Sequence, residues 1–493
     1  MSLHERLANV QSSASLIVIG LLALCIPSVV APLNNPLWHG CRTAAFEAGA
    51  VLVLAMAAVQ PWTRQRQKQW SEACQAPPVR IFLVLLLWGC LSAALSSAKA
   101  FAVQGVLLLV GGAVITITVA AEARSRLQYE FVLNALTGAT LVISLTGFAL
   151  FGANKMPLAV GLYYDHALFG AVFTVLLPIM LAISLSPAPV GRRLSGQTAF
   201  LCGLAALGLS ETRSAWIGFA VSLLIFAGLT LFVRARRSLK RGSGAERRGQ
   251  KIQSLVTGIL VLGVTIYLAA ALLQTGQIGE RLRTFSTTVP QGKEISVAWR
   301  FAAWAGGAKM LRQKPWTGWG IGGYPRWQYQ FTGVGQSAEI VQSQGPRITD
   351  EAHNSYLQIG VEMGLPGLLL WLGVLGSAFA LGVTSLRRLS PGSPSQWALI
   401  GCLSALVGQS VDAFANPGWQ FGEVSLFLWI VLGLTIALAL GQPKKADFGA
   451  HEWVLLQSAS IALLRRIAVA LTVMAALLWA IYRTMMVLPA PKL

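Results

Sequence analysis

Residues 166–186 read HALFGAVFTVLLPIMLAISLS, an apolar run that contains no Asp, Glu, Lys or Arg. A transmembrane helix needs about 20 such residues, because the hydrocarbon core is about 30 Å thick and an α-helix rises about 1.5 Å per residue. Comparable runs recur on both sides of this one, near residues 12–33, 43–61, 80–97, 101–120, 129–151, 197–211, 214–233, 253–273, 359–384, 397–413 and 423–441. The sequence therefore predicts an all-α polytopic membrane protein with about 12 transmembrane helices. A last apolar run, residues 467–482, is either a thirteenth span or a helix on the membrane surface.

The composition agrees with this fold class. Of the 493 residues, 55% are hydrophobic and only 11% are charged, whereas soluble domains carry about 25% charged residues. These values exclude a soluble globular enzyme and a disordered chain. A net charge of +20 would suggest nucleic-acid binding in a soluble chain, so the placement of the charges decides what they mean. The 6 cysteines form neither a disulfide framework nor a CxxC metal pattern.

Most of the basic residues lie in connections that would share one side of the membrane, among them the run Arg234–Lys251. Because short cytoplasmic loops are enriched in Lys and Arg, we expect the N-terminus to be cytoplasmic. The chain then divides into residues 1–273 with spans one to nine, a large helical loop on the outer side at 274–358, spans ten to twelve at 359–441, and a cytoplasmic segment at 442–493. This topology explains most of the charge, and we expect no nucleic-acid partner.

Arginines on the outer side suggest a site for an anion. Arg213 lies between spans seven and eight, where Ser210, Thr212 or Ser214 could cap the eighth helix. A helix N-terminus and a guanidinium both suit phosphate oxygens. An interfacial arginine that only reaches the lipid headgroups would look the same.

Two further arginines follow the ninth span. Arg281 and Arg283 could converge on a diphosphate, or they could form a solvated face near the headgroups.

A helix is predicted at the middle of the large loop. Arg300 and Trp304 lie one turn apart and would share a face. The glycine-rich segment 315–324 that follows has no preceding strand, so it is a tight turn packed on aromatic residues and not a dinucleotide motif.

His353 is the strongest candidate for a catalytic residue. It is one of 5 histidines in the chain and lies where the large loop returns to the membrane. It follows Asp350 and Glu351 and precedes Asn354 and Tyr356. An imidazole can accept a proton from a hydroxyl near neutral pH, and either acid could fix its tautomer. The adjacent acids favour this reading over an interfacial histidine.

Two lesser features also face the outer side. Asp165 and His166 open the sixth span and could line the same cavity, and Asp412 follows the eleventh. The outer face has no DxD or HExxH motif and no Cys/His cluster, so we expect neither a metal nor another cofactor.

Three blocks of sequence, in this order, resemble the O-antigen ligase/polymerase superfamily. They are TRSAW at 212–216, the Arg300…Trp304 helix leading into PWTGWGIG at 315–322, and AHNSYLQIGVEMGLPG at 352–367. The resemblance extends over about residues 200–385. It implies a GT-C-like glycosyltransferase of the bacterial inner membrane with its active site facing the periplasm.

In that family a glycan leaves undecaprenyl diphosphate and joins an acceptor hydroxyl. The family's essential Arg and His correspond to Arg213 and His353, and its arginine pair corresponds less securely to Arg281 and Arg283. The sequence shows no evident metal ligands, so these arginines and Arg300 would neutralise the diphosphate. Attack on the anomeric carbon from the face opposite the diphosphate would invert its configuration.

We favour an O-antigen ligase of lipopolysaccharide biosynthesis, whose acceptor is a sugar of the lipid A–core. An O-antigen or exopolysaccharide polymerase and a protein O-oligosaccharyltransferase of the same superfamily remain open. A transporter is disfavoured because its ionisable residues should lie at mid-membrane, whereas here they gather at the outer edge. A structural partner in an envelope complex would need no such constellation.

Overall fold

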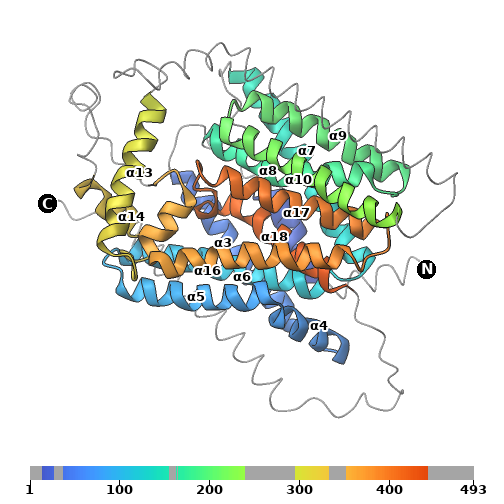
Figure 1. Ribbon diagram of the computed structural model, residues 1–493, viewed down its shortest axis with the longest axis horizontal. Helices are drawn as coiled ribbons and strands as arrows, with labels where there is room; N and C mark the ends of the chain where they lie inside the picture. The colour runs from blue at the N-terminus through green and yellow to red at the C-terminus, as the bar shows by residue number, and fades with distance from the viewer. Residues whose placement is uncertain are drawn as a thin grey trace.

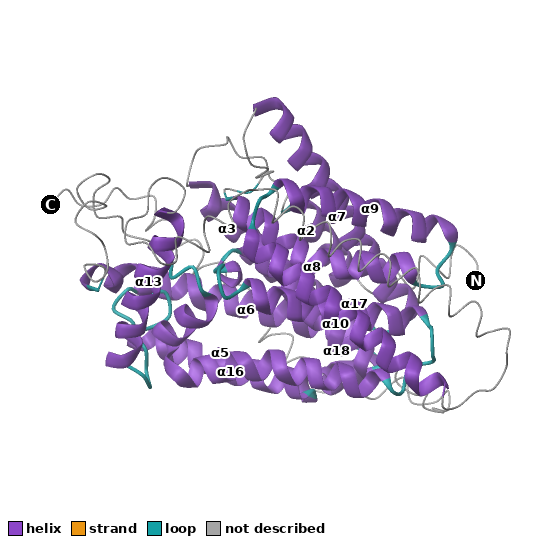
Figure 2. Ribbon diagram, turned by 45° about the horizontal axis from the view of Figure 1, so that its top comes forward, coloured by secondary structure: helices purple, strands orange, loops and turns teal. Residues whose placement is uncertain are grey.

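The computed structural model describes residues 14–26, 37–60, 62–154, 163, 165–238, 295–331 and 351–441. Within these ranges the chain forms helices and loops and no strand (Figure 2). The predicted span at 253–273 and the apolar run at 467–482 lie outside the described residues.

Most of the helices pack side by side in one bundle (Figure 1). Along the chain these are α2 (Ala14–Cys25), α3 (Leu37–Val59), α5 (Pro77–Leu95), α6 (Lys99–Glu122), α7 (Arg126–Asn154), α8 (His166–Leu185), α9 (Val190–Leu209), α10 (Arg213–Ser238), α16 (Ser355–Leu386), α17 (Pro394–Asp412) and α18 (Gly422–Leu440). Each of them overlaps one of the predicted spans.

Among the described residues, 7 helices are long and apolar enough to cross a membrane, namely α5, α6, α7, α8, α10, α16 and α18. The prediction of an all-helical polytopic membrane protein is therefore confirmed. The bundle has a buried centre, because α8 and α18 are covered almost along their whole length. Helices nearer the outside present large apolar side chains, such as Leu87, Leu201 and Leu369. A surface of this kind suits contact with lipid tails.

Smaller elements lie at one end of the bundle, which we call the site end. They are α13 (Ile295–Gln313), α14 (Tyr324–Trp327) and the 3₁₀ turns η2 (Gln328–Gln330) and η3 (Gly418–Gln420). In Figure 1 they lie at the left, and α13 stands across the direction of the bundle helices. The helices α8, α10, α16 and α18 begin at this end, and α17 finishes there.

The opposite end is closed by α4 (Arg64–Gln75), a helix that the sequence analysis treated only as a basic connection. Thr63 caps it by accepting a hydrogen bond from the N–H of Arg66. The side chain of Arg66 points into the protein, where its Nε and Nη2 lie 3.2 and 2.5 Å from Oε1 of Glu122 on α6. It also donates to the carbonyls of Gln60 and Ala57, which end α3.

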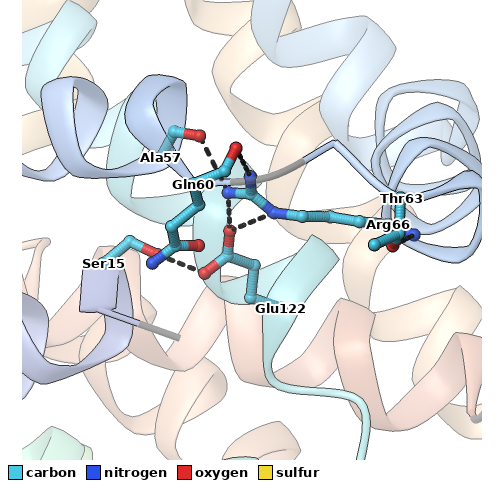
Figure 3. Close-up of polar contacts among 6 residues, drawn as sticks. All are labelled: Ser15, Ala57, Gln60, Thr63, Arg66 and Glu122. Atoms are coloured by element: carbon cyan, nitrogen blue, oxygen red, sulfur yellow. Dashed lines mark hydrogen bonds and ion pairs between the residues drawn. The ribbon is translucent and has the colours of Figure 1, made fainter. Parts of the chain in front are cut away.

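The second oxygen of Glu122 accepts a hydrogen bond from the hydroxyl of Ser15 on α2. Figure 3 shows how the guanidinium is enclosed by these partners. One buried ion pair thus joins α2, α3, α4 and α6, and we call it the Arg66–Glu122 cluster.

A break in α16 shapes the site end. Gly364 has φ 68° and ψ −178°, so the helix is interrupted there. The carbonyls of Val361 and Glu362 accept from the N–H groups of Trp319 and Gly320, each at 2.9 Å. An unsatisfied backbone group at membrane depth costs several kcal/mol, so broken helices need such outside partners. The glycine turn, residues 315–323, supplies them.

The turn itself is held from two sides. Its Gly318 has φ +67° and leaves no room for a Cβ, which would lie 2.3 Å from the carbonyl oxygen of Glu362. On its other side, the N–H of Ile321 donates to the hydroxyl of Ser92 on α5 at 2.9 Å. The glycine turn therefore connects α5 to the break in α16.

Replacing Gly364 by Ala should lower the free energy of unfolding by about 1–3 kcal/mol. The added Cβ would meet the carbonyl oxygen of Trp316 at 2.4 Å and would occupy a backbone conformation that L side chains rarely adopt. Unfolding can be followed by maleimide labelling of Cys402, which is fully buried on α17, in a chain whose other cysteines are replaced. Gly376→Ala is the control, because a Cβ there meets open space; equal midpoints for the two variants would contradict the prediction.

Candidate active site

The start of α8 supplies a carboxylate and an imidazole. Asp165 is the N-cap of α8, and its Oδ1 accepts a hydrogen bond from the N–H of Ala167 at 2.8 Å. The same oxygen lies 2.8 Å from Nδ1 of His166. Both side chains remain about one third exposed, at 38% and 39%. The two residues can therefore meet a substrate at the end of the bundle.

The start of α10 lies against the start of α8. The hydroxyl of Thr212 donates to the carbonyl oxygen of His166 at 2.7 Å. On the other side, Oγ of Ser214 accepts from Nδ2 of Asn416 at 3.1 Å. Arg213, between them, is half-buried at the N-terminus of α10. The predicted arginine thus sits at a helix N-terminus, where free N–H groups can bind an anion.

His353 occupies a strained turn just before α16. Its φ is 49°, and Glu211 is the only other described residue besides glycines with a positive φ. This left-handed conformation costs a non-glycine residue roughly 1–2 kcal/mol. Asn354 follows as the N-cap of α16, with its Oδ1 accepting from the N–H of Leu357 at 3.0 Å. Strain of this kind persists only where the surroundings enforce it, and it is common at functional sites.

The beginning of α16 is tied to the end of α17. The N–H of Ser355 donates to the carbonyl of Ala413 at 2.9 Å, and its hydroxyl donates to the carbonyl of Asn416 at 2.7 Å. One residue later, the hydroxyl of Tyr356 donates to the carbonyl of Ser410 at 2.6 Å. His353 is thereby fixed beside the same loop that contacts Ser214.

Arg300 and Asp165 act electrostatically on His353. Partial burial lowers the pKa of His353, the positive charge of Arg300 lowers it further, and the carboxylate of Asp165 partly offsets both. The imidazole is therefore neutral at pH 7 and can accept a proton. For Asp165, burial would raise the pKa, but the hydrogen bond and charge of His166, the N–H of Ala167 and the charge of His353 bring it below its usual value.

Asp412, which is only a lesser feature of the sequence, also acts on this group. It is fully buried, and its Oδ1 accepts from Nδ2 of Asn416 at 2.8 Å. Burial lowers the pKa of Arg300, while the charges of Asp165 and Asp412 raise it. The two carboxylates therefore offset the cost of holding the guanidinium of Arg300 in this place. The feature of the sequence that pointed to Asp412 was its position at the end of a predicted span.

The remaining predicted residues are distributed differently. Arg281, Arg283 and Asp350 lie outside the described residues. Glu351 is half-buried two residues before His353, but the carboxylate whose charge acts on His353 within the described part is Asp165. Trp304 lies one turn after Arg300 on α13 and contacts Phe301 edge-on, with 5.3 Å between ring centroids.

Within the described ranges, no group of three or more His, Cys, Asp or Glu side chains could hold a metal ion. Within these ranges Arg300 is a cation that acts on His353, and Arg213 stands at the N-terminus of α10.

Replacing Arg300 by Gln should move the acid limb of the pH–activity profile to higher pH. Removing the guanidinium removes a charge that opposes protonation of His353, so the pKa of His353 rises toward its usual value. The position of the limb is measured on the purified protein in nanodiscs, whatever the absolute rate. Lys309→Gln is a matched loss of charge at an exposed position of α13 and should leave the limb in place. A limb that stays put or moves to lower pH in Arg300→Gln would contradict this assignment.

A sequence model of the family described as O-antigen ligase matches residues 198–372. The matched stretch contains the start of α10, the α13 helix, the glycine turn and the His353 turn, and the match confirms the resemblance seen in the three motifs. No curated protein matches the chain.

Proposed function

Because residues 198–372 carry an O-antigen ligase domain of the O-antigen ligase/polymerase superfamily, we propose that the protein is a membrane-embedded glycosyltransferase. Its donor is a glycan linked to undecaprenyl diphosphate, and its acceptor is a sugar hydroxyl of the lipid A–core. The observation that carries this proposal is that Arg300 and Asp165 act electrostatically on His353 where the start of α8 lies against the N-terminus of α10. At one end of a membrane bundle, cations can bind the diphosphate of a lipid-linked donor, and a base can accept the proton of an acceptor hydroxyl.

In the proposed mechanism the diphosphate is the leaving group. Its developing charge is neutralised by Arg213 and Arg300, with Arg281 and Arg283 as further candidates. Preorganised donors aimed at developing charge are worth several kcal/mol each. Arginine offers a planar fork that binds two phosphate oxygens at once, so no metal is required for this step.

His353 takes the proton of the acceptor hydroxyl. The neutral imidazole is the form that can do so, and its lowered pKa keeps that form dominant near pH 7. The freed oxygen attacks the anomeric carbon from the face opposite the diphosphate. The new glycosidic bond forms as the bond to the diphosphate breaks, so the configuration at this carbon inverts.

We place the site end in the periplasm and the N-terminus in the cytoplasm of a bacterial inner membrane. The basic residues of the described connections support this orientation, because Arg124, Arg192, Arg193, Arg387 and Arg388 all belong to the end of the bundle opposite the site. Short loops on the cytoplasmic side of a membrane are enriched in Lys and Arg.

Arg213→Ala should lower transfer by about 10²–10³-fold, the usual cost of removing one donor from a charge-stabilising site. Arg213→Lys should recover only a small part of that loss, since lysine keeps the charge but loses the fork. Transfer is measured with purified donor lipid in nanodiscs. The control is Arg193→Lys, at an exposed position of α9 at the opposite end of the bundle, which should transfer glycan like the unaltered protein. A transfer rate restored in full by Arg213→Lys would contradict bidentate binding.

The acceptor is identified in a bacterial strain that lacks the gene. A ligase is expected to be needed for the whole ladder of chain lengths on lipid A–core, with restoration by the unaltered chain and not by a His353 variant. A single repeat unit left on the core would assign the polymerase reaction instead. Loss of a glycosylated protein with an intact ladder would assign the protein transferase, and a strain with all three products unchanged would overturn the proposal.

A further inference from the structure

Two fully buried polar side chains on α16 have no part in the chemistry described above. Gln358 and Glu362 lie one turn apart and are each only 1% exposed. Polar side chains at such positions are costly unless they find partners, and within the described residues all the polar side-chain atoms of the pair except Oε2 of Glu362 have one. Their partners therefore show what the pair holds in place.

Gln358 bonds to the backbone next to His353. Its Oε1 accepts the N–H of Ala352 at 2.9 Å, and its Nε2 donates to Oε1 of Glu362 at 3.2 Å. The orientation of this amide follows from the backbone N–H of Ala352, which can only donate and therefore faces the amide oxygen. Gln358 thus connects the residue before His353 to the carboxyl group of Glu362.

Glu362 bonds to the glycine turn. The same Oε1 accepts from the N–H of Tyr324 at 3.4 Å, and the backbone of Gly322 donates to the same carboxyl group. The carbonyl of Glu362 also accepts from the N–H of Gly320 at 2.9 Å and from the hydroxyl of Ser92 at 3.1 Å. The backbone of Glu362 is therefore held by α5 and the glycine turn, and its side chain is held by the glycine turn and the start of α14.

We propose that Gln358 and Glu362 are positioning residues for His353, forming a hydrogen-bonded relay that transmits the fixed position of the glycine turn to the left-handed His353 turn. The inference rests on the proposed function of His353 as the base. Ala352 is fully buried, and its N–H bond to Gln358 holds the chain just before His353. The Asn354 cap and the bonds of Ser355 hold it just after. With both flanks fixed, the backbone of His353 is held where Arg300 and Asp165 act electrostatically on its imidazole.

The relay requires particular hydrogen-bond donors and acceptors of each side chain. Gln358 must both donate and accept, so Met, which has a similar size and shape but no strong hydrogen-bonding group, removes the relay. Glu362 needs only an accepting oxygen at the Oε1 position, so Gln should preserve it and Met should not. A buried charge as such is not required by this role.

The test uses the full-length protein in nanodiscs and compares Gln358→Met, Glu362→Met and Glu362→Gln. A matched control is Gln396→Met. Gln396 is also buried, its Oε1 accepts from the N–H of Gly392 and its Nε2 donates to the carbonyl of Leu386, but it lies at the opposite end of the bundle. The control therefore loses the same kind of bonds without affecting His353.

Two readouts are taken. The first is the kcat and the KM for the donor lipid in glycan transfer. Misplacement of a reacting group by about 1 Å costs about 10²-fold, so Gln358→Met and Glu362→Met should lose kcat with little change in KM. The second readout is the rate at which diethyl pyrocarbonate modifies His353, followed by peptide mass spectrometry. This rate should rise several-fold in the same two variants as the turn relaxes, and it should stay near the unaltered value in Glu362→Gln and Gln396→Met.

The second readout needs no enzymatic activity. If the unaltered protein transfers no glycan, the proposed function fails, while the modification rates still decide whether the relay holds His353. The relay is overturned if Gln358→Met leaves both kcat and the modification rate like those of Gln396→Met. It is also overturned if Glu362→Gln is as damaging as Glu362→Met.

Discussion

Replacing His353 by Asn should reduce glycan transfer by about 10²–10⁴-fold, the range expected when a general base is removed. Asn is the informative choice because it tolerates the left-handed conformation better than most residues, and His353 has φ 49°. The backbone strain of the turn is then unchanged, and the loss reports the imidazole. The rate is measured with donor lipid and acceptor in nanodiscs, at a pH above the acid limb.

The fold of the variant must be shown to be intact. Its thermal midpoint, followed by labelling of Cys402, should match that of the unaltered chain. His353→Ala serves as the contrast, since it adds the cost of an alanine in a left-handed turn and should lower the midpoint slightly. Transfer by His353→Asn within a few-fold of the unaltered rate would contradict the assignment of His353 as the base.

The largest effect on stability is expected in the Arg66–Glu122 cluster. Arg66→Ala should lower the free energy of unfolding by about 3–5 kcal/mol, because it leaves the buried carboxylate of Glu122 without its charged partner. The carbonyls of Ala57 and Gln60 lose their donor as well. Thermal unfolding in detergent, read from Cys402, measures the change. The control is Lys68→Ala, an exposed position of α4, which should shift the midpoint very little.

The pair can be separated from its neighbours by a double-mutant cycle. Arg66→Ala and Glu122→Ala together should cost clearly less than the sum of the single variants, because the double variant leaves no unpaired buried charge. Strict additivity would mean that the two side chains do not stabilise each other. A neutral effect of Arg66→Ala would mean that the guanidinium is not buried as described.

The sequence predicted the helices of the bundle well, because each is encoded by its own apolar run. It did not predict α4, whose basic residues look like a solvated connection. What turns Arg66 inward is Glu122, and 56 positions separate the two in the chain. A local pattern carries no information about such a partner.

The same limit applies to the site. His353 and Arg213 stand in recognisable motifs, so they could be named from the sequence. That Asp165 acts on His353 depends on how α8 and α16 are placed around α17, and that Asp412 supports Arg300 depends on where α17 ends. The glycines at 318–322 predicted a tight turn, but their binding to the broken segment of α16 appears only in three dimensions.

The Arg66–Glu122 cluster also has a consequence for the order in which the chain assembles. During synthesis Arg66 emerges before Glu122, and at about 5–20 residues per second the delay lasts several seconds. Until α6 is in place, burying Arg66 would leave its charge unpaired at a cost of several kcal/mol. α4 therefore stays undocked at the aqueous surface until α5 and α6 have inserted. Its docking is the step that locks the first helices together, after their insertion is complete.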